Sequence, residues 1–313
     1  MIKCIQISLI MLMVQLTGCQ DQTKSTDGSS DSHLAKRVIV LGLDGLSVEG
    51  FKTAKHPNLD ALFEDGTISF TTRSVMPSVT LPNWTSHLTG SGPEEHGVDN
   101  NNWTLADHQL PPLEKDSDGY YPSIFKVLKD QMPNIKTAYY YNWGNLINPI
   151  NQKYLDEVNF LEDDAYEENY SKAKSFALKH KDDPTLIFLY SVHVDHAGHG
   201  HEWMSPEYIT AIEEADVKIG TLISDLKKDE LYEDTHFLLI TDHGGKGTGH
   251  GGMSPVEMTV PWGIKGPGIK KAKMLDDHNS NKNTALVLAR LFGRDSLPKS
   301  WTGKVPESIF ELK

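Results

Sequence analysis

The sequence contains little cysteine, few arginines and no apolar run long enough for a comfortable membrane span. Its two cysteines, Cys4 and Cys19, lie near the start, so the rest of the chain cannot form an intramolecular disulfide or a thiolate metal site. The only arginines are Arg37, Arg73, Arg290 and Arg294, and the formal net charge is −13. Because no basic stripe is present to neutralise a nucleic-acid backbone, DNA and RNA polymers are not expected as partners.

The first part of the chain has the layout of an export signal. Lys3 precedes the apolar stretch Ile5–Leu16, and small residues follow it. The segment Leu16-Thr17-Gly18-Cys19 resembles the bacterial lipobox, in which cleavage precedes the cysteine and the cysteine thiol receives a lipid. We therefore expect residues 1–18 to be a lipoprotein signal peptide, although an ordinary export leader is the alternative.

Residues 19–35 would then comprise the lipidated Cys19 and a flexible tether, because Asp21–Ser32 is polar and has no apolar periodicity. The protein is expected in the bacterial cell envelope, attached to a membrane through the lipid on Cys19 and facing the periplasm or the exterior. Attachment would rest on the acyl chains, since the acidic chain is repelled by anionic lipid.

Residues 36–313 are expected to form a single α/β domain. Of the 313 residues, 38% are hydrophobic and 23% charged, which suits a globular protein with a sizeable core. Short apolar runs alternate with helical patterns, which predicts a mostly parallel central sheet with helices on both faces. The predicted strands are Val38–Leu43, Thr137–Tyr141, Leu186–Val192, Phe237–Ile240 and Val260–Ile264.

The clearest predicted helix is Pro206–Lys228, with Ser205 as its N-cap. Shorter helices are predicted at Pro57–Phe63, Leu81–Leu88, Tyr170–His180 and Thr284–Phe292. Two stretches, Asp99–Tyr121 and Asn148–Glu168, do not follow the alternation. They are expected to be small cap or loop insertions, or irregular surface.

Three predicted strands are each followed closely by an aspartate. These residues are Asp44 before Gly45, Asp195 before His196 and Asp242 before His243. Ligands of an open parallel sheet bind at the carboxyl ends of its strands, so the three carboxylates are expected to face one crevice. One such aspartate is most simply a turn residue, but three together indicate a site.

Histidines at ligand spacing accompany these acids: His199, His243 and His250. Crowded carboxylates repel one another and take up protons, whereas divalent cations allow all of them to ionise. Carboxylates and imidazoles without thiolates suit zinc, with manganese or iron as alternatives. For the neighbouring His193, His196 and His201, supporting or structural roles are favoured.

Thr80 is the candidate nucleophile, in the segment Met76–Trp84. A threonine before Leu-Pro is most simply a helix N-cap. The two interpretations are compatible, because a helix N-terminus favours an oxyanion at the same place. A metal-bound hydroxyl there could lose its proton near neutral pH and attack a phosphorus centre.

Together these residues resemble the alkaline phosphatase superfamily and, within it, the nucleotide pyrophosphatase/phosphodiesterase branch, the type I phosphodiesterases. The matching segments extend from Gly42 to about Pro267. In order they are Gly42–Gly45, Pro77–Asn83, Thr89–Gly90, Glu95–Val98, Asp195–His199, Asp242–Gly245 and Gly249–Gly251. The resemblance implies an alkaline-phosphatase-like fold and a two-metal phosphoesterase that acts on a small phosphate ester.

Carried over to this chain, the resemblance implies two divalent metal ions, with zinc as the expected metal. One would be held by Asp195, His199 and His250, and the second by Asp44, Thr80, Asp242 and His243. It also implies that Thr80 forms a phospho-threonine intermediate. In the family an asparagine past the nucleophile binds a phosphate oxygen; counting favours Asn101, and Asn100 remains the alternative. His278 is the alternative to His250 as a ligand.

The expected activity is that of a phosphodiesterase or nucleotide pyrophosphatase. A phosphomonoesterase is the runner-up: no arginine closely accompanies Thr80 to bind the extra phosphate charge, although Arg73 and Lys246 are available. A phosphonate hydrolase is a further alternative. The non-enzymatic alternative is an envelope-anchored binding lipoprotein whose metal stabilises the fold.

Four aromatic residues are candidates for stacking on a leaving group, although such residues more often pack in a core. They are Trp84, Trp103, Tyr120 and Tyr121.

Overall fold

The computed structural model describes residues 34–162, 165–275 and 277–311. Contacts divide the chain into two units, Met1–Ser32 and His33–Lys313, and the described residues all belong to the second. The expected signal peptide, the lipidated Cys19 and most of the expected tether lie outside the described residues. Among the helices of the described ranges, none has the length and apolar character needed to span a bilayer.

A sheet of eight strands lies at the centre of this unit, in the order β4-β3-β5-β1-β6-β7-β2-β8. The strands are β1 (Arg37–Leu43), β2 (Thr67–Arg73), β3 (Lys136–Tyr141), β4 (Glu157–Phe160), β5 (Thr185–Ser191), β6 (Thr235–Ile240), β7 (Thr259–Lys265) and β8 (Lys273–Met274). β1, β3, β4, β5 and β6 run parallel, whereas β7 is antiparallel to both β6 and β2. The expected mostly parallel sheet is confirmed.

The five predicted strands correspond to β1, β3, β5, β6 and β7, with ends within two residues of those predicted. β1 and β5 are buried along their whole length, which explains their continuous apolar runs. The prediction missed β2, β8 and β4, of which β4 lies inside a stretch expected to be irregular. On this edge strand the apolar Val158 and Phe160 are exposed while Glu157 and Asn159 are half-buried, so the usual alternation is inverted.

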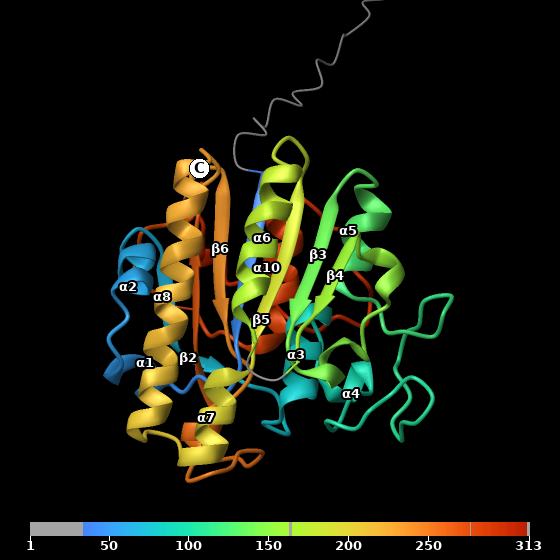
Figure 1. Ribbon diagram of the computed structural model, residues 1–313. Coiled ribbons are helices and arrows are strands. Elements are labelled where there is room, and N and C mark those ends of the chain that lie inside the picture. The colour runs from blue at the N-terminus through green and yellow to red at the C-terminus, as the bar shows by residue number, and fades with distance from the viewer. Residues whose placement is uncertain (1–33, 163–164, 276, 312–313) are drawn as a thin grey trace, which may run out of the picture. The chain divides into compact units, whose positions relative to one another are not determined.

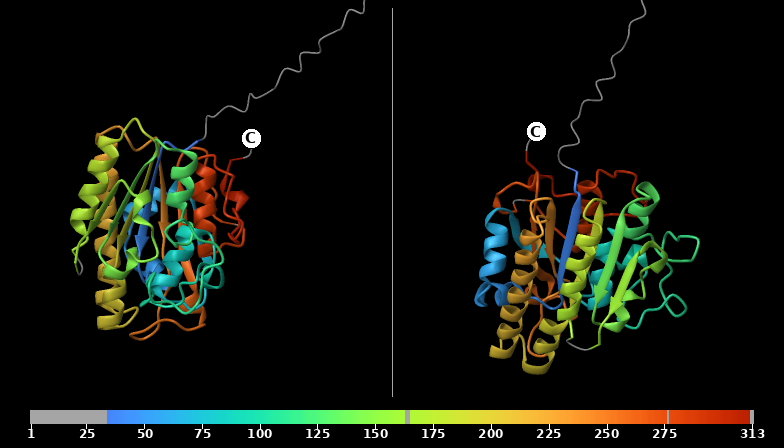
Figure 2. Two further views of the ribbon diagram at one scale, coloured as in Figure 1. Left: turned by 90° about the vertical axis from the view of Figure 1, so that its right-hand side faces the viewer. Right: turned by 45° about the horizontal axis from the view of Figure 1, so that its top comes forward.

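Helices cover both faces of the sheet, as expected. They are α1 (Val48–Thr53), α2 (Pro57–Glu64), α3 (Thr80–Thr89), α4 (Pro93–His96), α5 (Ile124–Gln131), α6 (Glu167–Lys179), α7 (His193–His201), α8 (Pro206–Lys228), α9 (Pro255–Met258) and α10 (Thr284–Leu291). α3, α5 and α10 share one apolar core with the sheet, and α1, α2, α6 and α8 share the other. Figures 1 and 2 show α6 and α8 on one face and α10 on the other.

All five predicted helices are present. α8 has the predicted bounds, and the Ser205 side chain caps it by accepting a hydrogen bond from the backbone N–H of Tyr208 at 3.1 Å. The prediction missed α1, α5 and α7 together with the short α4 and α9. α7 is the important omission, because it carries Asp195, which the sequence predicts at the end of a strand.

Candidate active site

Asp44, Asp195 and Asp242 lie at the edge of the sheet where β1, β5 and β6 end. Asp44 directly follows β1, and Asp242 is the second residue after β6. The prediction that Asp195 also ends a strand is wrong, because it lies in the first turn of α7. Since α7 begins two residues after β5 ends, the Asp195 carboxylate still reaches the same edge.

Gly45 allows the three acidic residues to approach one another closely. Its φ is +67°, in the left-handed region that glycine tolerates. A Cβ atom at this position would lie 2.8 Å from Asp195 Oδ1, so a side chain would displace Asp195. The backbone N–H of Gly45 also donates a hydrogen bond to Asp242 Oδ1 at 3.0 Å. Gly45, next to Asp44, thus lies against Asp195 and bonds to Asp242, which brings the three carboxylates together.

The three candidate histidine ligands share one arrangement. In each, Nδ1 lies at hydrogen-bond distance from a backbone carbonyl oxygen: 2.8 Å for His199, 3.0 Å for His243 and 3.0 Å for His250. A carbonyl only accepts, so Nδ1 carries the proton in each neutral ring. The lone pair is then on Nε2, the atom available to a metal.

Each of these Nε2 atoms faces a carboxylate. His199 Nε2 lies 3.4 Å from Asp195 Oδ2, and His250 Nε2 lies 3.9 Å from Asp195 Oδ1. His243 Nε2 lies 3.1 Å from Asp242 Oδ2 and 3.6 Å from Asp44 Oδ1. Carboxylate oxygens and imidazole nitrogens therefore converge on a common space.

Two groups of possible ligand atoms are compact enough to hold a metal ion. Asp195, His199 and His250 form one, and Asp44, Asp195 and His243 form the other, with the ligand atoms of each group within 4.8 Å of one another. Asp195 contributes to both groups. The structure thus brings together the six side chains expected as ligands, with Asp242 beside the second group through its contact with His243.

Thr80 is the first residue of α3, and the N-cap position belongs to Val79. The N-cap interpretation of Thr80 is therefore wrong. Its Oγ1 lies 3.3 Å from His243 Nε2, in the acidic cluster, and the residue is 5% exposed. The hydroxyl is thus placed at the start of a helix and beside the second group of ligand atoms.

Of the two candidate asparagines, Asn101 lies beside the start of α3, next to Thr80, whereas Asn100 does not. Asn101 Oδ1 accepts a hydrogen bond of 2.8 Å from the backbone N–H of Leu81, the residue after Thr80. Asn100 is exposed, and its side chain bonds only to its neighbours Asp99 and Asn102 among the described contacts.

The charges of the cluster are unfavourable without a cation. Burial and the nearby Asp242 carboxylate raise the pKa of Asp44, and burial raises the pKa of Asp242. Burial lowers the pKa of His243, and burial together with His243 lowers the pKa of His250 to about 3. In addition, Asp44 Oδ1 and Asp242 Oδ2 are buried without a hydrogen-bond partner among the described residues. Unsatisfied carboxylate oxygens facing neutral imidazoles fit divalent cations.

The remaining candidates lie elsewhere or support the fold. His278 is exposed and belongs to neither group of ligand atoms. Trp103 and Tyr121 are buried in apolar clusters, which confirms that they are packing residues. Tyr120 is half-buried in the loop before α5.

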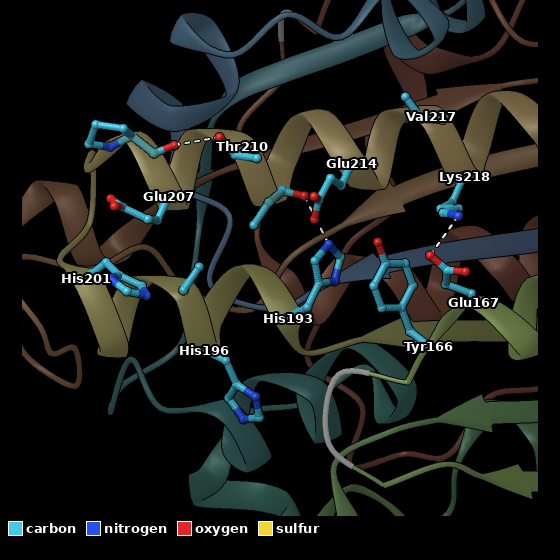
Figure 3. Close-up of a pocket in the computed structure, with 13 residues that line it drawn as sticks. Tyr166, Glu167, His193, His196, His201, Glu207, Thr210, Glu214, Val217 and Lys218 are labelled. Atoms are coloured by element: carbon cyan, nitrogen blue, oxygen red, sulfur yellow. Dashed lines mark hydrogen bonds and ion pairs between the residues drawn. The ribbon is translucent and has the colours of Figure 1, made fainter.

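His193, His196 and His201 line a separate pocket of about 850 Å³ between α7 and α8, drawn in Figure 3. There the His193 ring stacks on Tyr166 at 3.9 Å, and His193 Nε2 lies 3.0 Å from the carbonyl oxygen of Ala211 on α8. His193 thus ties α7 to α8, the supporting role that the sequence favoured.

Sequence reasoning missed the surroundings of Asp44. The indole N–H of Trp84 and the hydroxyl of Tyr190 both donate hydrogen bonds to Asp44 Oδ2. The sequence predicts only stacking on a leaving group or packing in the core for Trp84. A signal for Tyr190 was present, since a tyrosine near the carboxyl end of a buried parallel strand places its hydroxyl close to the ligand-binding edge.

A mostly parallel sheet with three acids, three imidazoles and one hydroxyl at its carboxyl edge defines an α/β protein with a candidate metal site. Residues 38–256 match the family model described as type I phosphodiesterase / nucleotide pyrophosphatase. The chain therefore belongs to the type I phosphodiesterase / nucleotide pyrophosphatase family.

Individual relatives agree with this assignment. An uncharacterized pyrophosphatase/phosphodiesterase of Schizosaccharomyces pombe is 30% identical over 217 residues, covering 66% of this chain and 44% of the relative. Ectonucleotide pyrophosphatase/phosphodiesterase family member 3 of Mus musculus is 27% identical over 215 residues, covering 66% of this chain and 24% of the relative. The chain thus spans less than half the length of these two relatives.

Solved structures show the same fold. Murine ectonucleotide pyrophosphatase/phosphodiesterase 5, an inactive T72A form in complex with AMP, superposes with a TM-score of 0.73 at 16% identity. The match covers 88% of this chain and 100% of that one. The lipoteichoic acid synthase LtaP of Listeria monocytogenes superposes with a TM-score of 0.66 at 18% identity, covering 88% of this chain and 76% of that one.

Proposed function

We propose that the protein is a metal-dependent phosphoesterase that cleaves small phosphodiesters or nucleotide pyrophosphates. The observation that carries this proposal is the position of Thr80 Oγ1, which lies 3.3 Å from His243 Nε2, beside the second group of metal-ligand atoms. A binding protein with a merely structural metal would have no need of a hydroxyl at this position. Membership of the type I phosphodiesterase / nucleotide pyrophosphatase family supports the same activity.

In the proposed site, Asp195, His199 and His250 hold one divalent cation, and Asp44, Asp242, His243 and the Thr80 hydroxyl hold a second. Zinc is the metal that this donor set suits best. When bound, the two cations supply neutralising charge to the carboxylates and favour the ionised form of the Thr80 hydroxyl.

Thr80 is proposed to act as the nucleophile. Its Oγ1 attacks phosphorus, the bond from phosphorus to the leaving oxygen breaks, and the leaving alcohol or phosphate takes up a proton. Water then cleaves the phospho-threonine ester, which releases the remaining phosphate ester and restores the hydroxyl. Asn101 is held beside Thr80 by the N–H of Leu81, in a position from which its amide N–H can bind a phosphate oxygen.

A diester is favoured over a monoester because the four arginines are bound elsewhere. Arg37 donates to the carbonyl oxygen of Leu231, Arg73 to Thr259 Oγ1 and Arg294 to the carbonyl oxygen of Phe292, and Arg290 lies over the Phe310 ring. The monoesterase alternative rests on Lys246, which is exposed in the loop before His250. A phosphonate hydrolase would use the same threonine.

The test is hydrolysis of bis-p-nitrophenyl phosphate and p-nitrophenyl phosphate by the zinc-loaded protein. We expect diester hydrolysis that Thr80→Ala abolishes and Thr80→Ser partly retains. A monoester preference of roughly tenfold in kcat/KM would reverse the order of the two activities. A Thr80→Ala variant that hydrolyses esters at the wild-type rate would eliminate Thr80 as the nucleophile. A zinc-loaded wild-type protein that hydrolyses neither ester would contradict the proposed phosphoesterase activity.

We also propose that residues 1–18 are removed and that Cys19 carries the lipid that attaches the protein to the cell envelope. Expression of the full chain in a bacterium with a radiolabelled fatty acid should label the protein. A Cys19→Ser variant should remain unlabelled and should leave the detergent phase of a Triton X-114 partition. Labelling of the Cys19→Ser variant would contradict the proposed attachment.

A further inference from the structure

The carboxylate of Asp44 is held from one side only. The Tyr190 hydroxyl donates to Asp44 Oδ2 at 2.5 Å, and the Trp84 indole N–H donates to the same oxygen at 3.0 Å. The other oxygen, Oδ1, accepts no hydrogen bond from the described residues and faces His243 Nε2 at 3.6 Å. The two oxygens of one carboxylate are thus divided between a donor pair and the candidate cation site.

The two donors are fixed by packing. Trp84 is 1% exposed and Tyr190 is fully buried, and their rings meet edge to face at 5.1 Å and 86°. Gly42 on β1 pairs with Tyr190 on β5, and a Cβ at Gly42 would lie 2.9 Å from Trp84 Cη2. The missing side chain at Gly42 therefore makes room for the indole against the strand that carries Asp44.

Helix geometry links this arrangement to the nucleophile. Thr80 and Trp84 are four residues apart on α3, so their side chains project from the same face of the helix. Thr80 Oγ1 reaches His243, and Trp84 Nε1 reaches Asp44. One face of α3 thus carries both the candidate nucleophile and a donor that orients a candidate ligand.

We propose that Tyr190 and Trp84 are positioning residues that fix the rotation of the Asp44 carboxylate and so present Oδ1 to a divalent cation. Both donors are neutral, so they orient the carboxylate without cancelling its charge. Hydrogen-bonded partners of this kind typically change metal affinity by about 10- to 100-fold when removed. The inference rests on the proposed function only in requiring that a divalent cation binds at Asp44.

The test measures zinc binding to the full chain after chelator treatment, by competition with a fluorescent zinc chelator. Tyr190→Phe keeps the ring and removes the donor, and we expect it to weaken zinc binding about tenfold or more. Tyr139→Phe is the matched control: Tyr139 is equally buried, stacks on Phe188 as Tyr190 does, and donates instead to the carbonyl oxygen of Leu146. It should bind zinc as the wild type does.

A second comparison separates positioning from a general loss of packing. If Tyr190 acts through Asp44, Tyr190→Phe should have no further effect on zinc binding in an Asp44→Asn background. An additional loss in that background, or an equal loss in Tyr139→Phe, would overturn the proposal. Trp84→Phe should also weaken zinc binding. Unchanged zinc binding in that variant would show that Trp84 is not a positioning residue.

The result also distinguishes this inference from the proposed function. If Tyr190→Phe binds zinc with wild-type affinity and the wild type shows zinc-dependent hydrolysis, the positioning role is refuted. The proposed phosphoesterase function is then retained. If Tyr190→Phe binds zinc more weakly but the wild type hydrolyses no ester, the positioning role is supported and the proposed phosphoesterase function is refuted. A wild-type chain that binds no zinc would overturn both.

Discussion

Asn100 and Asn101 are adjacent in the chain but have different surroundings. Asn101 accepts a hydrogen bond from the Leu81 N–H, and its carbonyl oxygen accepts one from the Asn145 side chain at 2.9 Å. Asn100 is exposed and bonds only locally among the described contacts. Composition cannot separate the two, because the difference arises from residues far away in the chain.

Asn101→Ala should lower kcat/KM for the preferred ester by about 100-fold, the typical loss when one preorganised donor to a transition-state oxygen is removed. Asn100→Ala provides the matched control and should change kcat/KM by less than about threefold. Steady-state kinetics on the zinc-loaded variants measures both. Equal losses in the two variants would contradict the assignment.

His96 should make the protein sensitive to acid. Burial lowers its pKa to about 3, and His96 Nδ1 accepts a hydrogen bond from the Val98 N–H, so protonation of Nδ1 would break that bond. Because the unfolded histidine takes up a proton near pH 6.5, His96 should reduce the free energy of unfolding by about 1.4 kcal/mol per pH unit as pH falls from 6.5 towards 3.

Urea unfolding between pH 7 and pH 4 would measure this dependence. The His96→Gln variant should show a shallower loss over the same range, because its side chain does not titrate. Parallel curves for the wild type and the variant would show that His96 does not contribute.

At the scale of elements, α3 depends on a buried asparagine that holds the segment before it. Asn83 Nδ2 lies within 3.3 Å of the carbonyl oxygens of Val75, Pro77 and Val79, and Asn83 Oδ1 accepts from the Val75 N–H at 2.8 Å. Asn281, before α10, donates to the same Asn83 Oδ1 and to the carbonyl oxygen of Asp242. The loop that leads to Thr80 is thus tied to the candidate ligand Asp242.

Asn83→Ala should lower the free energy of unfolding by about 2–4 kcal/mol, because it leaves several buried backbone groups without partners. Ser205→Ala is the comparison at another helix. It removes only the N-cap of α8, with an expected cost of about 1 kcal/mol. Chemical unfolding checks both, and an Asn83→Ala cost no larger than that of Ser205→Ala would contradict the role given to Asn83.

At the scale of the described unit, the candidate site joins segments that are far apart in the chain. Asp44, Asp195 and Asp242 follow three neighbouring strands, β1, β5 and β6, whose order in the sheet differs from their order in the sequence. Burying these acids together has an electrostatic cost, which cation binding would offset. Stability should therefore depend on metal and pH together.

Metal-free protein should become less stable as pH rises from 7.5 to 8.5. Burial and the nearby Asp242 carboxylate raise the pKa of Asp44 to about 8, and burial raises that of Asp242, whereas the usual aspartate value is about 4. In this range the folded state holds protons that the unfolded state has released, so the free energy of unfolding should fall by about 1 kcal/mol. Histidines, whose unfolded pKa is about 6.5, are largely neutral in both states above pH 7.5.

Urea unfolding after chelator treatment, at pH 7.5 and pH 8.5, tests this sign. Added zinc should raise stability, and more so at pH 8.5, because less of the binding energy is then used to release protons from the carboxyls. An increase in the stability of the metal-free protein between pH 7.5 and 8.5 would contradict the raised pKa values.

The sequence by itself determined most of the local structure and the residue types at the site. Apolar periodicity is a property of short segments, so α8 and the five predicted strands could be located without the fold. Asp44 and Asp242 could be placed at strand ends for the same reason. The inverted pattern of β4 and the short helix α7 gave no comparable local signal.

Only the tertiary structure decided which side chains meet. It placed Asp195 on α7, turned β7 antiparallel, brought Asn101 rather than Asn100 to Thr80, and directed Tyr190 and Trp84 to Asp44. Contacts of this kind depend on strand order and on the packing of helices against the sheet. These are set by burial of apolar surface across the whole unit, which no short stretch of sequence records.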